Sequence, residues 1–141
     1  MHRRTDALLT AGDGSLLLRA GSRPGREAEL WITAHAGAGP PVGEIRFQVC
    51  AGCRVGRVRS LWVDEMWRRE GVGSDLLGAA VGARPGFRWT TTLQSRAGRR
   101  FFAASGGRVG VSLPSGGPLC RHLTGRLERW WRRSRPVRDA A

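Results

Sequence analysis

The stretch that decides the fold is Leu61-Trp62-Val63-Asp64-Glu65-Met66-Trp67-Arg68-Arg69-Glu70-Gly71-Val72-Gly73-Ser74-Asp75-Leu76-Leu77. A predicted strand ends at Val63, and from Gly71 onward the apolar residues follow helical spacing. Those apolar positions are Val72, Leu76, Leu77, Ala80 and Val81. Asp75 stands in the first turn, where the helix dipole favours a carboxylate. The stretch therefore predicts a strand, a short loop and a helix that begins near Gly71.

The loop and the helix start have the features that hold a pyrophosphate. Gly71 and Gly73 lack Cβ atoms, so phosphate oxygens could touch the backbone there. The helix start offers unpaired N–H groups and a positive dipole end to an anion, and Arg68 and Arg69 add charge. For the hexamer taken alone, an ordinary strand–turn–helix is the default explanation, because glycines before helices are common. A Walker loop and a dinucleotide fingerprint are excluded, since no G-K-[ST] follows and only two glycines are present.

Upstream of this stretch, the sequence predicts an antiparallel meander with turns at residues 21–25, 37–41 and 51–53. The predicted strands are residues 15–19, 27–35, 44–50 and 55–63, of which the last two form the clearest hairpin. Their apolar residues alternate onto one face, as Ile45, Phe47 and Val49 do.

Downstream, Gly82, Pro85 and Gly86 end the first helix. The sequence then predicts a strand at 87–94, a short helix at 96–104 capped by Ser95, and a last strand at 108–113. A helix that joins two neighbouring strands makes a parallel crossover, so we expect an α+β fold with a mixed, mostly antiparallel sheet and flanking helices. Residues 1–116 are predicted to form this domain, and residues 117–141 a basic amphipathic C-terminal segment.

These features resemble the GNAT superfamily of acyl-CoA N-acyltransferases. The family pattern is a strand ending in L-x-V, then [RQ]-x-x-G-x-[GA], then a helix with paired leucines. It is matched in register by Leu61, Val63, Arg68, Gly71, Gly73, Leu76 and Leu77. Residues 97–107 resemble the family's later A-x-x-F-Y-x-x-x-G-F helix more loosely. The resemblance runs from Val42 to about Leu113, half of the chain.

The resemblance implies an N-acetyltransferase that moves an acetyl group from acetyl-CoA to an amine by direct attack. It implies that the backbone of Leu61 to Val63 pairs with the pantetheine arm, where a bulge or splay opens the sheet. The N–H groups from Arg69 to Ser74 would cradle the pyrophosphate, and an N–H near Val63 would polarise the acetyl carbonyl. The implied cofactor residues are Leu61, Trp62, Val63, Arg68, Arg69, Glu70, Gly71, Val72, Gly73 and Ser74.

The sequence departs from the family in two ways. Phe102 stands where many members have a thiolate-protonating Tyr, and the chain has no Tyr. Gln94 and Ser95 could orient a water instead, although a polar strand end or a helix cap explains them too. The family's N-terminal helix pair is not evident in residues 1–26.

The candidate general bases are Glu29, His35, Glu44, Asp64 and Glu65, and for each of them the alternative is an ordinary solvated charge. A catalytically silent module that binds CoA or a partner therefore stays open.

Cys50-Ala51-Gly52-Cys53 forms a C-x-x-C at the predicted hairpin tip, and Cys120 and His122 follow near the C-terminus. Together they supply four soft ligands, enough for one tetrahedral zinc. We expect the predicted last strand to bring Cys120 to the edge of the sheet where the hairpin tip lies. Reduced thiols with an exposed histidine are the alternative, and a disulfide is not expected in a reducing compartment.

The net charge is +13, and all 24 basic residues are Arg. Such a field favours acidic partners, which include a phosphate-bearing cofactor or RNA, and a basic nucleic-acid-binding protein is a further alternative function. Residues 119–131 combine leucines and tryptophans at helical spacing with arginines, which suits either docking on the sheet or contact with an anionic surface. No apolar run is long enough for a membrane span, and a cytoplasmic location is expected. The amine acceptor, small molecule or protein, is not specified by the sequence, nor is the oligomeric state.

Overall fold

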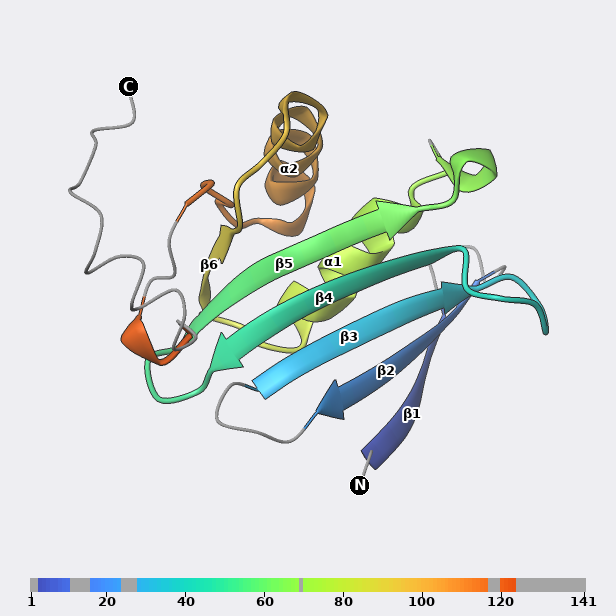
Figure 1. Cartoon of the computed structure of the whole chain (residues 1–141), viewed down its shortest axis with the longest axis horizontal. Helices are drawn as coiled ribbons and strands as arrows, with labels where there is room; N and C mark the ends of the chain where they lie inside the picture. Colours follow the sequence, from blue (N-terminus) through green and yellow to red (C-terminus); the bar gives the residue numbers. More distant parts are fainter. Residues whose placement is uncertain (1–2, 11–15, 24–27, 69, 117–119, 124–141) are drawn as a thin grey trace, which may run out of the picture.

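One sheet of six strands forms the frame of the molecule in the computed structural model, which describes residues 3–10, 16–23, 28–68, 70–116 and 120–123 (Figure 1). The strands pair in chain order: β1 (Arg3–Thr10), β2 (Leu17–Arg23), β3 (Ala28–His35), β4 (Gly43–Cys50), β5 (Val55–Val63) and β6 (Arg88–Thr91). Every pair up to β4–β5 is antiparallel, and β5–β6 is parallel. The predicted mixed, mostly antiparallel sheet is therefore confirmed.

The N-terminal part of the sheet is larger than the sequence predicts. β1 was missed, and β2 continues through Gly21, where a turn was predicted. A Cβ at Gly21 would overlap the ring of Trp31 on β3, so this glycine permits a close contact between strands. The helix pair that the sequence lacks is also not found in residues 3–10 and 16–23, because these form strands.

Helix α1 (Val72–Gly82) makes the crossover from β5 to β6 and packs over β3, β4 and β5. A Cβ on Gly43 would lie 3.2 Å from side-chain atoms of Val72 and Leu76, so the β4 residues that share its face point at α1. Beneath the helix, Phe47 lies between the ring of Trp89, at 5.9 Å, and the guanidinium of Arg84, at 5.2 Å. The predicted apolar stripe of α1 is buried as expected: Val72, Leu76, Leu77, Ala80 and Val81.

Helix α2 (Arg96–Val109) is longer than the predicted 96–104, and the predicted last strand at 108–113 is wrong. The pair Gly106-Gly107 continues the helix, which ends one turn later at Gly110 with φ +78°. A Cβ at Gly106 would lie 2.7 Å from the Val111 carbonyl oxygen, so this glycine lets the chain fold back against the helix. Among the described residues after α2, an isolated parallel bridge between Thr91 and Ser115 extends the sheet. The cap by Ser95 is confirmed, because its hydroxyl accepts from the Gly98 N–H at 3.0 Å.

The C-terminal segment covers part of the second sheet face. The short 3-10 helix η2 (Arg121–Leu123) contacts β4, and Leu123 is fully buried. Since Phe47 and Val49 face α1, their neighbour Gln48 faces the other side, and it is buried together with Arg57 and Thr90 of the adjoining strands. Docking of the predicted amphipathic stretch is thus observed at Leu123, and residues 124–131 lie outside the described part.

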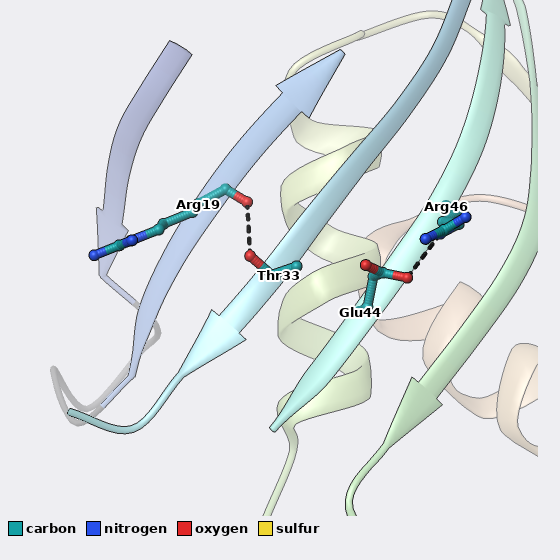
Figure 2. A network of polar contacts seen from close by, with 4 residues as sticks. All are labelled: Arg19, Thr33, Glu44 and Arg46. Atoms are coloured by element: carbon teal, nitrogen blue, oxygen red, sulfur yellow. Dashed lines mark hydrogen bonds and ion pairs between the residues drawn. The ribbon is translucent and has the colours of Figure 1, made fainter. Parts of the chain in front are cut away.

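Further along the same face, the sheet carries exposed polar groups (Figure 2). The Thr33 hydroxyl donates to the Arg19 carbonyl at 3.4 Å, and Arg46 Nε donates to Glu44 Oε1 at 2.8 Å. The hydrogen bond to Glu44 and the charge of its carboxylate raise the pKa of Arg46 above its usual value. The ion pair is open to solvent, so it contributes little to stability.

In the described residues, no helix is long and apolar enough to cross a membrane.

A pair of Leu→Ala substitutions tests whether the C-terminal segment is part of the fold. Leu123 is 1% exposed and Leu93 is 92% exposed. We expect Leu123→Ala to lower the free energy of unfolding by about 2–4 kcal/mol through lost burial and a cavity. Leu93→Ala should change it by less than about 0.5 kcal/mol. Urea unfolding followed by tryptophan fluorescence measures both, and equal values would show that the segment does not dock.

Candidate functional site

The site begins where β5 and β6 part. The two strands pair only from Val55 to Val58 of β5, and the last backbone bond between them runs from the Thr92 N–H to the Val58 carbonyl at 2.9 Å. Arg59 is an extra residue in the β4–β5 ladder, where the register shifts, and its carbonyl accepts from the Thr92 hydroxyl at 3.0 Å. Beyond this bulge, β6 no longer accompanies β5. The gap is a cavity of about 810 Å³ between β5, the start of α1 and helix α2.

The peptide groups of Leu61 and Val63 point into this gap. The Asp64 N–H donates to the Val42 carbonyl at 2.7 Å, which makes Gly43 and Val63 a non-hydrogen-bonded pair of the antiparallel ladder. By the same alternation, Leu61 also directs its N–H and C=O away from β4. Arg68 Nε donates to the Val63 carbonyl at 3.3 Å, which ties the loop to the strand end. This half of β5 is thus an open sheet edge that an extended ligand could pair with.

The first turn of α1 forms one end of the cavity. Helical bonding starts with the Asp75 N–H donating to the Gly71 carbonyl at 2.9 Å, so the N–H groups of residues 72–74 make no bond within the helix. Gly71, Val72, Gly73 and Ser74 all line the cavity, with Arg68 beside them. Glu70 is exposed and lies outside this lining, and Arg69 falls outside the described residues.

The two glycines of the cradle have different structural roles. Gly71 has φ +80°, a left-handed conformation that other residues adopt at a cost, and a Cβ there would meet no atom within 4 Å. Gly73 has an ordinary backbone, but a Cβ there would lie 2.9 Å from the Phe101 ring. Gly71 therefore shapes the turn and leaves open space beside it, whereas Gly73 lets α2 approach α1.

Helix α2 forms the opposite wall, of which the sequence singled out Phe102 but not Ser105 or Arg108. Its cavity-lining residues include Ala97, Phe101, Ser105 and Arg108, spaced three or four residues apart along one helix face. The hydroxyls of Ser74 and Ser105 lie 2.9 Å apart and join the two helices. That helical spacing was the available signal, but the helix was predicted to end before Ser105.

The cavity is positively charged. Its lining contains Arg59, Arg68 and Arg108, and no carboxylate or histidine of the described residues belongs to it. The structure thus brings none of the five predicted general bases to the cavity: Glu29, His35, Glu44, Asp64 and Glu65. Asp64 accepts from the Met66 N–H at 3.1 Å and caps the short helix η1 (Glu65–Trp67), whereas Glu44 is paired with Arg46. A field of this sign attracts anions and offers no built-in base.

The predicted water-orienting residues are engaged in the fold. Gln94 Nε2 donates to the Thr91 hydroxyl at 2.6 Å and to the Leu113 carbonyl at 2.8 Å, which holds the segment after α2 against the end of β6. Ser95 caps α2, as described above. Phe102, at the position of the missing Tyr, lines the cavity but has no hydroxyl that could protonate a thiolate.

A second cluster lies at the other end of β5. The ligand atoms of Cys50, Cys53, Cys120 and His122 all lie within 4.8 Å of one another. Side-chain hydrogen bonding to Cys50 raises the pKa of Cys53 to about 11, whereas the Cys53 backbone N–H lowers the pKa of Cys50. The sequence prediction that these residues meet is confirmed, although an irregular segment and not the predicted last strand brings Cys120 there.

Comparisons with known proteins concern the fold. No protein-family model matches the sequence, and no curated protein matches it significantly. A presumed acetyltransferase from Deinococcus radiodurans R1 is structurally similar, with a TM-score of 0.48, 17% identity, and 66% of this chain and 62% of that one covered. Nourseothricin acetyltransferase has a TM-score of 0.34 and 22% identity, over 56% of this chain and 52% of that one.

An aminoglycoside acetyltransferase from an uncultured soil metagenomic sample, solved in complex with trehalose, has a TM-score of 0.34 and 14% identity. The match covers 80% of this chain and 60% of that one. The chain thus spans between 52% and 62% of the length of these structures. At these values the comparisons carry no argument about function, and the predicted fold class, a mixed, mostly antiparallel sheet with two helices, rests on the topology of this chain itself.

A double-mutant cycle tests the packing role of Gly73. Gly73→Ala should lower the free energy of unfolding by about 1–3 kcal/mol, because its methyl group overlaps the Phe101 ring. In a Phe101→Leu background the same change should cost much less, since the smaller side chain leaves room. Urea unfolding of the four proteins gives the coupling free energy. Additive effects would show that the two side chains do not meet.

Proposed function

We propose that the protein is an N-acetyltransferase that binds acetyl-CoA between β5 and α2 and transfers its acetyl group to an amine. The observation that carries the proposal is the parting of β5 from β6, which exposes an unpaired strand edge directly beside an uncapped helix N-terminus. An extended amide-containing arm that ends in phosphates fits this combination.

The residues fit acetyl-CoA at both ends of the cavity. The pantetheine arm would pair with the peptide groups of Leu61 and Val63, and the pyrophosphate would accept from the N–H groups of residues 72–74. Arg68 lies within the same lining, and Arg108 reaches it from α2. Acetyl-CoA would supply an activated acyl carbonyl and a thiolate leaving group. An unpaired N–H of the strand edge, at Val63, would stabilise negative charge on that carbonyl oxygen.

The protonation chemistry would depend on solvent. No carboxylate or imidazole of the described residues lines the cavity, so an amine would have to reach it already deprotonated. Binding and orientation of the two substrates, with charge stabilisation by the strand edge, would then supply most of the rate enhancement.

Matched substitutions at Gly71 test the cofactor site. Asn and Asp both tolerate the left-handed conformation at φ +80°, and they have nearly the same shape. Either side chain enters the open space beside the helix N-terminus, but only Asp adds a negative charge near the phosphates. We expect isothermal titration with acetyl-CoA to show at least about ten-fold weaker binding for Gly71→Asp than for Gly71→Asn.

The control for this titration is Arg19→Ala, which removes one charge from an exposed position on β2, remote from the cavity lining. Its affinity for acetyl-CoA should match that of the wild type. If the wild-type protein does not bind acetyl-CoA, the proposed function is wrong. If Asp and Asn bind equally well, the pyrophosphate does not lie at this helix start.

The pH dependence of acetylation tests the lack of a built-in base. For two acceptor amines of different pKa, kcat/KM should rise about ten-fold per pH unit and level off at the pKa of each amine. An inflection at one pH for both amines would show that a residue of the protein acts as the base. Binding of acetyl-CoA without turnover of any amine would favour the catalytically silent module.

Contact with a polyanion such as RNA stays a prediction supported by the net charge of +13. Its signature would be an affinity for RNA that falls steeply as the salt concentration rises.

A further inference from the structure

We propose that Cys50, Cys53, Cys120 and His122 bind one structural zinc ion, which fastens the C-terminal segment to the β4–β5 turn. The four side chains come from two parts of the chain that are about 70 residues apart, and their ligand atoms all lie within 4.8 Å of one another. Figure 1 shows η2 beside this turn. The cluster is separate from the cavity, none of whose lining residues belongs to it.

Two distances within the cluster, both from the histidine to a cysteine sulfur, match a tetrahedral zinc site. His122 Nδ1 lies 3.6 Å from Cys50 Sγ and 3.4 Å from Cys53 Sγ. Zn–S bonds of about 2.3 Å and a Zn–N bond of about 2.0–2.1 Å, at tetrahedral angles, place S and N about 3.5 Å apart. The imidazole nitrogen therefore lies at the distance from both sulfur atoms that it would have if all three atoms bound the same zinc ion. This geometry also assigns Nδ1, rather than Nε2, as the ligand atom.

The local backbone supports the pairing of Cys50 with Cys53. Two intervening residues are the short spacing that lets one turn supply two zinc ligands. Directly after Cys53, Arg54 has φ +53°, the one positive φ of a non-glycine residue in the described part of the chain. Its N–H donates to the Ala51 carbonyl at 3.3 Å, which closes the turn.

The chemistry of the ligand set is that of a structural zinc site, for which three cysteines and one histidine are a common combination. Three thiolates and one imidazole are soft ligands, and no carboxylate of the described residues belongs to the cluster, which disfavours Mg²⁺ and Ca²⁺. Four protein ligands fill a tetrahedron and leave no open position for a substrate, so the site is structural rather than catalytic. Binding would release protons from the thiols to solvent.

The site has a clear structural use, because Cys120 directly precedes η2 and His122 lies within it, next to Leu123. Leu123 is buried, η2 contacts β4, and Gln48, Arg57 and Thr90 are buried on the sheet face that α1 leaves uncovered. A segment this short loses considerable conformational entropy when it docks through one leucine. A metal bond to the hairpin would offset that loss and keep the second face covered.

Metal analysis of the purified, reduced protein tests the proposal directly. We expect about one zinc per chain, and the thiols should resist alkylation until a chelator is added. Co²⁺ in place of zinc should give the intense d–d absorption of a tetrahedral site together with thiolate charge-transfer bands. Chelation should also lower the Tm, because an ion bound only to the folded state stabilises it.

Matched variants separate a metal site from a thiol cluster. Cys120→Ser should lose zinc, whereas His122→Cys should keep it as a four-cysteine site. His35→Ala removes a histidine outside the cluster and should keep full zinc content. These measurements detect the metal and not acetyl-CoA, so their outcome is independent of the proposed enzymatic function.

Three outcomes would overturn the proposal. One is a wild-type protein that takes up neither zinc nor tetrahedral Co²⁺ after full reduction, a result that needs no variant to fold. Another is zinc retained equally by the wild type and by Cys120→Ser. The third is a Cys50–Cys53 disulfide that forms in the presence of zinc at stoichiometric concentration.

Discussion

The rest of the structure depends on the hydrogen bonding of β5, which is complete on one side and interrupted on the other. β4 accompanies β5 along its whole length, but β6 pairs only with its first four residues, Val55 to Val58. The Arg59 bulge marks the point where the second side becomes free. Because buried peptide groups need partners, an edge of this kind inside a cavity is stable when water or a ligand pairs with it. The cavity and its proposed ligand therefore follow from where one ladder stops.

The loop after β5 shows how one short motif can satisfy two demands. Gly71 adopts φ +80° and turns the chain into α1, and Gly73 admits the Phe101 ring of α2. From the sequence, both glycines were predicted to let phosphate oxygens approach the backbone. In the structure, only the space beside Gly71 is open, so Gly73 acts on the site by setting the distance between two helices. The same packing holds the Ser74 and Ser105 hydroxyls together at 2.9 Å.

The sequence predicted those elements whose periodicity is strong and local. The β4–β5 hairpin and α1 were predicted almost to the residue, because alternation and helical spacing are clear there. β1 was missed since Leu8 and Leu9 are adjacent and no clean alternation precedes them. The prediction of the last strand was wrong because Gly106 was expected to end α2. In the structure this glycine lies inside the helix, where the absence of a Cβ lets the chain after α2 fold back against it. That tertiary contact cannot be read from the sequence alone. The part of the α2 wall beyond Ala104, with Ser105 and Arg108, was therefore not predicted. In contrast, the prediction that the three cysteines and His122 meet was correct, although the reason given for it, a last strand that ends near the hairpin tip, was wrong.

The excess of arginine gives these sites a common electrostatic basis. With 24 basic and 11 acidic residues, the chain cannot neutralise itself, and self-repulsion opposes its compact state. Arg59, Arg68 and Arg108 border one cavity in which no acidic residue of the described chain lies. A zinc site with three thiolates carries a net negative charge, and in the sequence Arg54 directly follows Cys53 and Arg121 directly follows Cys120. Phosphates at one end of β5 and thiolates at the other would each place negative charge where the fold concentrates positive charge. Both would therefore stabilise the folded state as well as serve their own chemistry.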